Sequence, residues 1–160
     1  MKRFLFAALV MLSALNFSCT KGGRMCCANP YQPYMSAEKN GIKWDAAVST
    51  SRIAGDSLAI AGSQTEERLV IRIMFNGKGI YNLTGNQATF FTTVGQDVLT
   101  SEYGVDNSTK STIEITEYDN TKAIITGTYY IALKRAANKY PGSPETIRFL
   151  KGTFSTYLKN

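Results

Sequence analysis

The chain of 160 residues contains no histidine, and its three cysteines, Cys19, Cys26 and Cys27, all lie near the N-terminus. Without histidine the most common general base is missing, and neither a Ser-His-Asp nor a Cys-His arrangement can be assembled. A structural zinc site needs four cysteine or histidine ligands, so we expect no metal site and no cofactor. The composition therefore favours a protein that is not an enzyme.

Cysteine is absent after position 27, so the main part of the chain must form its core without disulfides even in an oxidising compartment. If Cys19 is modified, Cys26 and Cys27 remain as a pair. Their state is open between a vicinal disulfide, an intermolecular link and two free thiols.

Clusters of one charge are also lacking, although Lys and Arg outnumber Asp and Glu by 18 to 12. Nucleic-acid binding requires a basic stripe or patch, and the scattered basic residues predict none. No phosphate-binding loop is expected, because Gly77-Lys78-Gly79 falls in a predicted turn between strands. Glu114 and Glu117 lie on one predicted strand, where a spacing of three points them to opposite faces and disfavours a glycosidase pair.

Long apolar runs are missing except at the N-terminus, where one extends from Phe4 to Leu15 behind Lys2 and Arg3. The run is shorter than the roughly 20 residues that cross a bilayer. A basic start, a short apolar segment and a small residue at the cut are typical of a secretory signal. The pattern predicts that this segment is removed during export.

The residue after the expected cut is Cys19, with Ser18 before it. A cysteine at that place is typical of a bacterial lipoprotein, so we predict a signal peptide over residues 1–18 and lipidation of Cys19. Asn16 departs from the usual Leu, Val or Ile, which leaves ordinary cleavage to a soluble periplasmic protein as the alternative. Two or three acyl chains would hold the protein stably on its membrane.

Residues 19–38 contain glycine, Pro30 and Pro33 without hydrophobic periodicity, and we predict that they form a flexible linker. The linker has no acidic residue directly after the cysteine. This favours an outer-membrane lipoprotein that faces the periplasm.

Residues 39–160 alternate apolar and polar side chains in short runs separated by turns, which is typical of β-strands. Leu69, Ile71, Ile73 and Phe75 form one such run, and the following Asn76-Gly77 predicts a tight hairpin. No helical span separates the runs. The chain therefore predicts a single all-β domain of about eight to nine strands, either an antiparallel β-sandwich or a β-barrel.

Five phrases of this domain resemble a family of Bacteroidota lipoproteins whose domain has no known function. The phrases are Asn40-Gly41-Ile42-Lys43-Trp44-Asp45-Ala46, Gly77-Lys78-Gly79-Ile80-Tyr81-Asn82-Leu83, Ile113-Glu114-Ile115-Thr116-Glu117-Tyr118-Asp119, Ile125-Thr126-Gly127-Thr128-Tyr129 and Gly152-Thr153-Phe154. The resemblance implies an all-β lipoprotein and supplies no catalytic residues.

Two functions are compatible with these features. The preferred one is a non-catalytic, membrane-anchored domain that binds an envelope protein, a glycan or another partner. The alternative is a small-molecule carrier similar to lipocalins, which also have a tryptophan on the first strand, here Trp44. Its cavity would be lined by four aromatic residues, which otherwise fill the core: Tyr81, Phe90, Tyr129 and Phe154.

One modification motif lies inside the predicted domain. Asp56-Ser57-Leu58 fits the short Asp-Ser/Thr-apolar pattern to which Bacteroidota attach O-glycans. Its position at the entry to a predicted strand makes Ser57 an accessible candidate for O-glycosylation.

Overall fold

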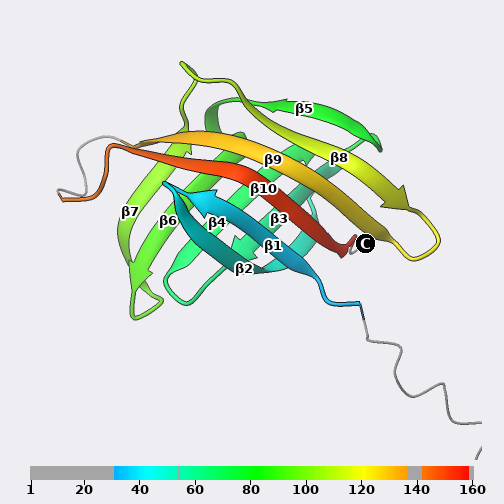
Figure 1. Cartoon of the computed structure of the whole chain (residues 1–160), viewed down its shortest axis with the longest axis horizontal. Helices are drawn as coiled ribbons and strands as arrows, with labels where there is room; N and C mark the ends of the chain where they lie inside the picture. Colours follow the sequence, from blue (N-terminus) through cyan, green and yellow to red (C-terminus); the bar gives the residue numbers. More distant parts are fainter. Residues whose placement is uncertain (1–30, 54, 137–141, 159–160) are drawn as a thin grey trace, which may run out of the picture. The chain divides into compact units, whose positions relative to one another are not determined.

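The computed structural model describes residues 31–53, 55–136 and 142–158, which form one antiparallel sheet of ten strands (Figure 1). The strands are β1 (Tyr34–Lys39), β2 (Ile42–Arg52), β3 (Ser57–Ser63), β4 (Glu67–Met74), β5 (Gly79–Leu83), β6 (Ala88–Val94), β7 (Val98–Val105), β8 (Ser111–Asp119), β9 (Ile124–Arg135) and β10 (Thr146–Tyr157). A short 3-10 helix, η2 (Gly85–Gln87), joins β5 to β6. No α-helix occurs in these three segments, so none there could cross a membrane.

Eight of the strands close into a barrel in the order β10-β1-β2-β3-β4-β6-β7-β9, because β9 also pairs with β10. The all-β prediction is confirmed, and the architecture is a barrel with two further strands. These are β8 and β5, which continue the sheet from β9. Strand β9 belongs both to the barrel and to the extension formed by β8 and β5. Its first part pairs with β8, and only its last three residues pair with β7.

The inner face of the barrel follows directly from the alternation in the sequence. On β4, Leu69, Ile71 and Ile73 are buried in the main hydrophobic cluster, whereas Arg72 and Met74 are exposed. The same period of two on the other strands places one apolar row per strand inside. The strand pattern read from the sequence is therefore also the pattern of the core.

The predicted linker is too long at its C-terminal end, because β1 begins at Tyr34. Met35 and Ala37 are buried on its inner face. Asn40 and Gly41 have φ angles of 50° and 84° and join β1 to β2 as a two-residue turn. Positive φ at both positions is what a type I′ hairpin requires. The barrel thus begins before position 39. The sequence pattern assigns its first strand to the linker because prolines precede it.

The hairpin predicted at Asn76-Gly77 is wrong. Strand β4 pairs with β3 and β6, whereas β5 pairs only with β8. Gly77 has a φ of 106°, but Asn76 does not have the positive φ of a type I′ turn. The Tyr81 hydroxyl instead donates to the Gly77 carbonyl oxygen at 2.7 Å, so a side chain holds an open loop where a tight turn was expected.

Two strands also differ from the sequence pattern. Strand β7 was not predicted, since its inner face contains Ser101 among Tyr103 and Val105 and therefore lacks a clean apolar alternation. Strand β10 is continuous through Gly152, where a shift of register against β9 falls between Phe149 and Gly152. Without these two features the count of strands cannot be read correctly from the chain.

Candidate functional site

Aromatic rings occupy the barrel interior. Trp44 packs edge-on against Phe149 with ring centroids 5.1 Å apart, Phe149 contacts Phe90 at 5.4 Å, and Phe90 contacts Tyr103 at 5.9 Å. All four side chains are at most 2 % exposed. Such pairs add about 0.5–1.5 kcal/mol each beyond the burial of their surface. This row of rings stabilises the barrel from within.

Three glycines in the sheet give further rings their space. A Cβ atom at Gly62 would lie 2.8 Å from the Trp44 ring, and one at Gly127 would lie 2.8 Å from the Phe154 ring. A Cβ atom at Gly152 would lie 2.5 Å from the Tyr129 ring. These separations are shorter than van der Waals contact, so the rings rest directly on the backbone. Two of the residues expected to line a cavity, Tyr129 and Phe154, are thus packed against the backbone of the sheet.

The four aromatic residues predicted as cavity lining do not share one environment. Phe90, Phe154 and Tyr129 are buried in the core, and the Tyr129 hydroxyl donates to the Ser36 carbonyl oxygen at 3.2 Å. Burial raises the pKa of Tyr129 well above its ordinary value. Tyr81 lies on β5, outside the closed eight strands, and is only half-buried. The structure therefore brings three of the four together as core.

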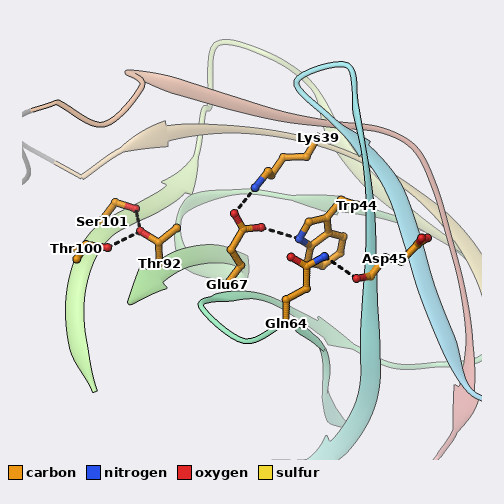
Figure 2. A network of polar contacts seen from close by, with 8 residues as sticks. All are labelled: Lys39, Trp44, Asp45, Gln64, Glu67, Thr92, Thr100 and Ser101. Carbon is orange, nitrogen blue, oxygen red and sulfur yellow. Dashed lines mark hydrogen bonds and ion pairs between the residues drawn. The ribbon is translucent and has the colours of Figure 1, made fainter. Parts of the chain in front are cut away.

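A polar cluster occupies the end of the barrel at which β1 turns into β2 (Figure 2). The Glu67 carboxylate forms an ion pair with Lys39 and accepts a hydrogen bond from Trp44 Nε1 at 2.8 Å. The Lys39 ammonium also lies 5.5 Å from the centre of the Phe90 ring. Both charged side chains are 22 % exposed. Glu67 thus joins three strands and covers the aromatic row with paired charges.

Hydroxyl groups continue this cluster on β6 and β7, as Figure 2 shows. Thr92 Oγ1 lies 2.8 Å from Thr100 Oγ1 and 2.5 Å from Ser101 Oγ. Among the described residues, every buried side-chain nitrogen or oxygen atom has a hydrogen-bond partner. The buried polar groups at this end of the barrel therefore have hydrogen-bond partners within the protein, as expected for a cluster that closes the barrel structurally.

The outer face of β2, β3, β4 and β6 carries a hollow of about 470 Å³, which we call the outer hollow. Its floor is a second hydrophobic cluster, separate from the core, made of Ala59, Ala61 and Val70 with Phe91 packed against them. These residues alternate with inward neighbours along their strands, so they belong to the outside. The three small side chains are nevertheless no more than 8 % exposed.

Two arginines flank this floor on β4. Arg68 and Arg72 lie on either side of Val70 and both line the outer hollow. Within the described segments Arg68 has no hydrogen-bond or ion-pair partner, and Arg72 donates only to the Asn86 carbonyl oxygen, at the long distance of 3.5 Å. The lining residues include no carboxylate. The hollow therefore combines an apolar floor with two uncompensated positive charges.

The carboxylates form no comparable site in the described residues, where no group of three or more metal-ligating side chains occurs. Hydrogen bonds from Lys43 and Ser36 keep the pKa of Asp45 below its ordinary value, and the hydroxyl and backbone of Ser108 do the same for the pKa of Asp106. A lowered pKa keeps these exposed groups ionised rather than ready to donate a proton. They act as turn and surface charges.

The prediction that Glu114 and Glu117 face opposite sides is wrong. The register of β8 on β9 shifts between Ile115 and Glu117, so Glu114 pairs with Thr128 and Glu117 with Thr126. Both threonines face outward, which puts both glutamates on the exposed outer face. A β-bulge supplies the extra residue that reverses the expected alternation.

The structure tests neither of the two predicted modifications. Ser57 is the first residue of β3 and is half-buried on the outer side of the sheet, and its glycosylation stays a prediction. Cys19 lies outside the described residues, as do Cys26 and Cys27. Lipidation and the state of the cysteine pair therefore stay predictions too.

Sequence reasoning did not select the residues of the outer hollow. In the sequence, Arg68 and Arg72 resemble the other scattered basic residues, and Phe91 is a second aromatic residue beside Phe90. One signal was available: β3 is apolar at successive positions, Leu58 to Ala61, which means that both of its faces are covered. Which arginines lie next to it depends on the order of the strands.

These observations define an all-β protein built on a closed eight-stranded antiparallel barrel. Residues 31–157 match the family described as a domain of unknown function, DUF6252, and the chain belongs to that family. The match confirms the expectation of a domain without known function, and it coincides with the barrel, including β1. No curated protein and no solved structure matches the chain.

Proposed function

We propose that the protein is a membrane-anchored lipoprotein whose barrel binds a partner of the cell envelope through its outer surface and catalyses no reaction. The observation that carries this proposal is the contrast between the two faces of the sheet. Aromatic rings that pack on one another and on glycines line the inner face, whereas the outer face has an apolar hollow with two arginines that form no ion pair.

A binding role on the outside agrees with the absence of histidine and with the satisfied polar groups at the barrel end. The predicted lipid on Cys19 supplies the place of action, which we assign to the periplasmic side of the outer membrane. An envelope protein or a glycan anchored nearby would meet the barrel at a high effective concentration, so a modest affinity is sufficient.

A carrier function similar to that of lipocalins is the weaker alternative. The barrel architecture is compatible with it, but a ligand site would require roughly 300 Å³ of connected interior space. Phe90, Tyr129 and Phe154 would have to leave their packed positions to open such a space. The interior rings therefore favour the binding domain over the carrier.

The anchor is tested by metabolic labelling with a clickable fatty acid in cells that express the wild type or Cys19→Ala. We expect label on the wild type and none on the variant. Equal labelling of both, or of neither, would remove the lipid from the proposal.

Partner binding is tested by affinity purification of the anchored full chain from native envelope. A partner should be enriched over the Cys19→Ala control and should be lost when the purified wild-type barrel is added as competitor. Failure to enrich any envelope component under cross-linking would contradict the proposal. Titration with a fluorescent fatty acid distinguishes the carrier function from partner binding, since saturable binding of the fatty acid would favour the carrier.

A further inference from the structure

We infer that the outer hollow binds an extended acidic segment of a partner protein, with carboxylates at positions i and i+4 and an apolar side chain at i+2. The inference rests on the proposed function and names the chemistry of the partner. It is carried by the spacing of Arg68, Val70 and Arg72 on β4.

The three β4 residues are two positions apart and share the outer face. A strand rises about 3.3 Å per residue, so the two arginine Cα atoms are separated by about 13 Å along the strand. An extended peptide has the same repeat, and its side chains at i, i+2 and i+4 fall at matching intervals. Each carboxylate then meets one guanidinium, and the central apolar side chain meets Val70 and Phe91.

The charges of the hollow suit such a partner. Arginine binds carboxylates through paired N–H donors, and these bonds are stronger than neutral ones. Neither Arg68 nor Arg72 forms an ion pair in the described part of the chain, although Glu102 lies on the same face opposite Phe91. Arg68 and the N–H groups of Arg72 that do not point to the Asn86 carbonyl oxygen thus remain free to recognise an external anion.

The segments outside the described residues supply no acidic side chain for the hollow. Residues 1–30, 54, 137–141 and 159–160 contain no Asp or Glu, and the basic residues among them carry the same sign as the hollow. A second copy is disfavoured as well, because a chain without the predicted signal peptide loses Lys2 and Arg3 and still has a net charge of +4, from 16 basic and 12 acidic residues. We therefore assign the acidic group to a different molecule.

A polypeptide fits better than an anionic membrane surface. Anionic lipid surfaces are recognised by clusters of about 4–8 basic residues, whereas two arginines line this hollow, at the two ends of an apolar floor. The volume of about 470 Å³ suits a few side chains. A peptide with an extended backbone would place those side chains in register with β4.

The test uses the full chain in mild detergent and a fluorescein-labelled peptide, Gly-Glu-Ser-Leu-Ser-Glu-Gly, followed by fluorescence anisotropy. We expect saturable binding that weakens about tenfold in the double variant Arg68→Gln/Arg72→Gln, since the variant loses two exposed ion pairs with the peptide. The matched control, Arg148→Gln/Lys110→Gln, removes the same charge elsewhere on the exposed surface and should bind like the wild type.

Two control peptides test the spacing. Replacing both Glu by Gln should abolish binding, and placing the two Glu side by side should weaken it several-fold. Circular dichroism and thermal unfolding of the double variant verify that it keeps the barrel. A folded double variant that binds as well as the wild type would overturn the inference, and so would equal binding of the two spacings.

Vesicles of phosphatidylglycerol provide the competing outcome. Binding of the wild type to these vesicles that the double variant loses, without peptide binding, would assign the hollow to lipid and overturn the peptide. An envelope partner that the double variant retains would also overturn this inference, while leaving the proposed function intact. Only the absence of any envelope partner would remove both.

Discussion

Strands β3, β4 and β6 carry an apolar cluster on each of their faces, and the two clusters differ in kind. The inner one holds large side chains in mutual contact, such as Phe90 and Leu69, at zero exposure. The outer one has small side chains, Phe91 at its border and two arginines beside it. Neighbouring residues of the same strand thus serve stability on one side and, by our proposal, recognition on the other.

The contrast shows why burial alone does not identify the core. Ala59, Ala61 and Val70 are almost as buried as the interior residues, yet they have only one another and Phe91 as apolar neighbours. Truncating a side chain in a fully packed core removes many contacts, whereas truncating one on the floor of a shallow hollow removes few. Substitutions on the two faces should therefore differ in their effect on the free energy of unfolding.

The adjacent pair Phe90 and Phe91 should show the largest difference. Phe90→Ala removes a fully buried ring that contacts Phe149 and Tyr103, and we expect it to lower the free energy of unfolding by about 3–5 kcal/mol. Phe91→Ala should cost about 1 kcal/mol. Denaturant unfolding monitored by circular dichroism measures both. Equal losses would show that the outer cluster is a second core.

Two glycines give the next comparison. A Cβ atom at Gly127 would lie 2.1 Å from the Glu114 carbonyl oxygen, whereas at Gly104 the nearest atom would be 3.5 Å away. We expect Gly127→Ala to cost about 1–3 kcal/mol through overpacking and Gly104→Ala to change stability by less than about 0.5 kcal/mol. Thermal unfolding of the two variants gives the answer. A stable Gly127→Ala barrel would mean that β8 and β9 can separate at no cost.

Ion pairs on the two faces provide a third comparison. Glu67→Gln removes the charge that pairs with Lys39 at the half-buried barrel end, and we expect a loss of about 1–2 kcal/mol because the ammonium is left uncompensated. Lys43→Gln breaks an exposed pair with Asp45 and should leave stability unchanged. Unfolding at low and high salt measures both effects. A salt-sensitive loss in Lys43→Gln alone would reverse the expected order.

The smallest effect concerns Tyr129. Tyr129→Phe deletes the hydrogen bond to Ser36 and should cost about 1 kcal/mol at neutral pH. Burial raises the pKa of Tyr129 in the folded state, so its stabilising contribution is complete below the unfolded pKa of about 10 and is lost as pH rises above it. The wild type should therefore lose stability more steeply than Tyr129→Phe between about pH 10 and about pH 11. Parallel pH curves would contradict the assigned burial.

The two Asn-Gly pairs show how far local signals reach. Asn40-Gly41 forms the two-residue turn that its composition favours, whereas Asn76-Gly77 joins two strands that do not pair. Both dipeptides have the same intrinsic preference. The difference comes from β8, which takes β5 as its partner and leaves the second pair in an open loop.

The candidate site could be predicted only in part. The apolar run Leu58 to Ala61 indicates a strand covered on both faces. The run does not predict that Arg68, Arg72 and Phe91 lie around the outer apolar cluster. These residues are brought together by the pairing of β3 with β4 and of β4 with β6. Nor does local alternation reveal the bulge that turns Glu117 outward.

The sequence by itself determined the all-β class, the two-residue period of most strands and the lack of histidine chemistry, because side-chain alternation and composition are local properties. The signal peptide and the lipidation of Cys19 are inferred from the sequence and stay predictions. Only the tertiary structure decided the closure of β9 onto β10, the placement of β5 beside β8 and the packing of interior rings on glycines. These depend on pairings between distant residues, whose free energy is gained only when the whole barrel closes.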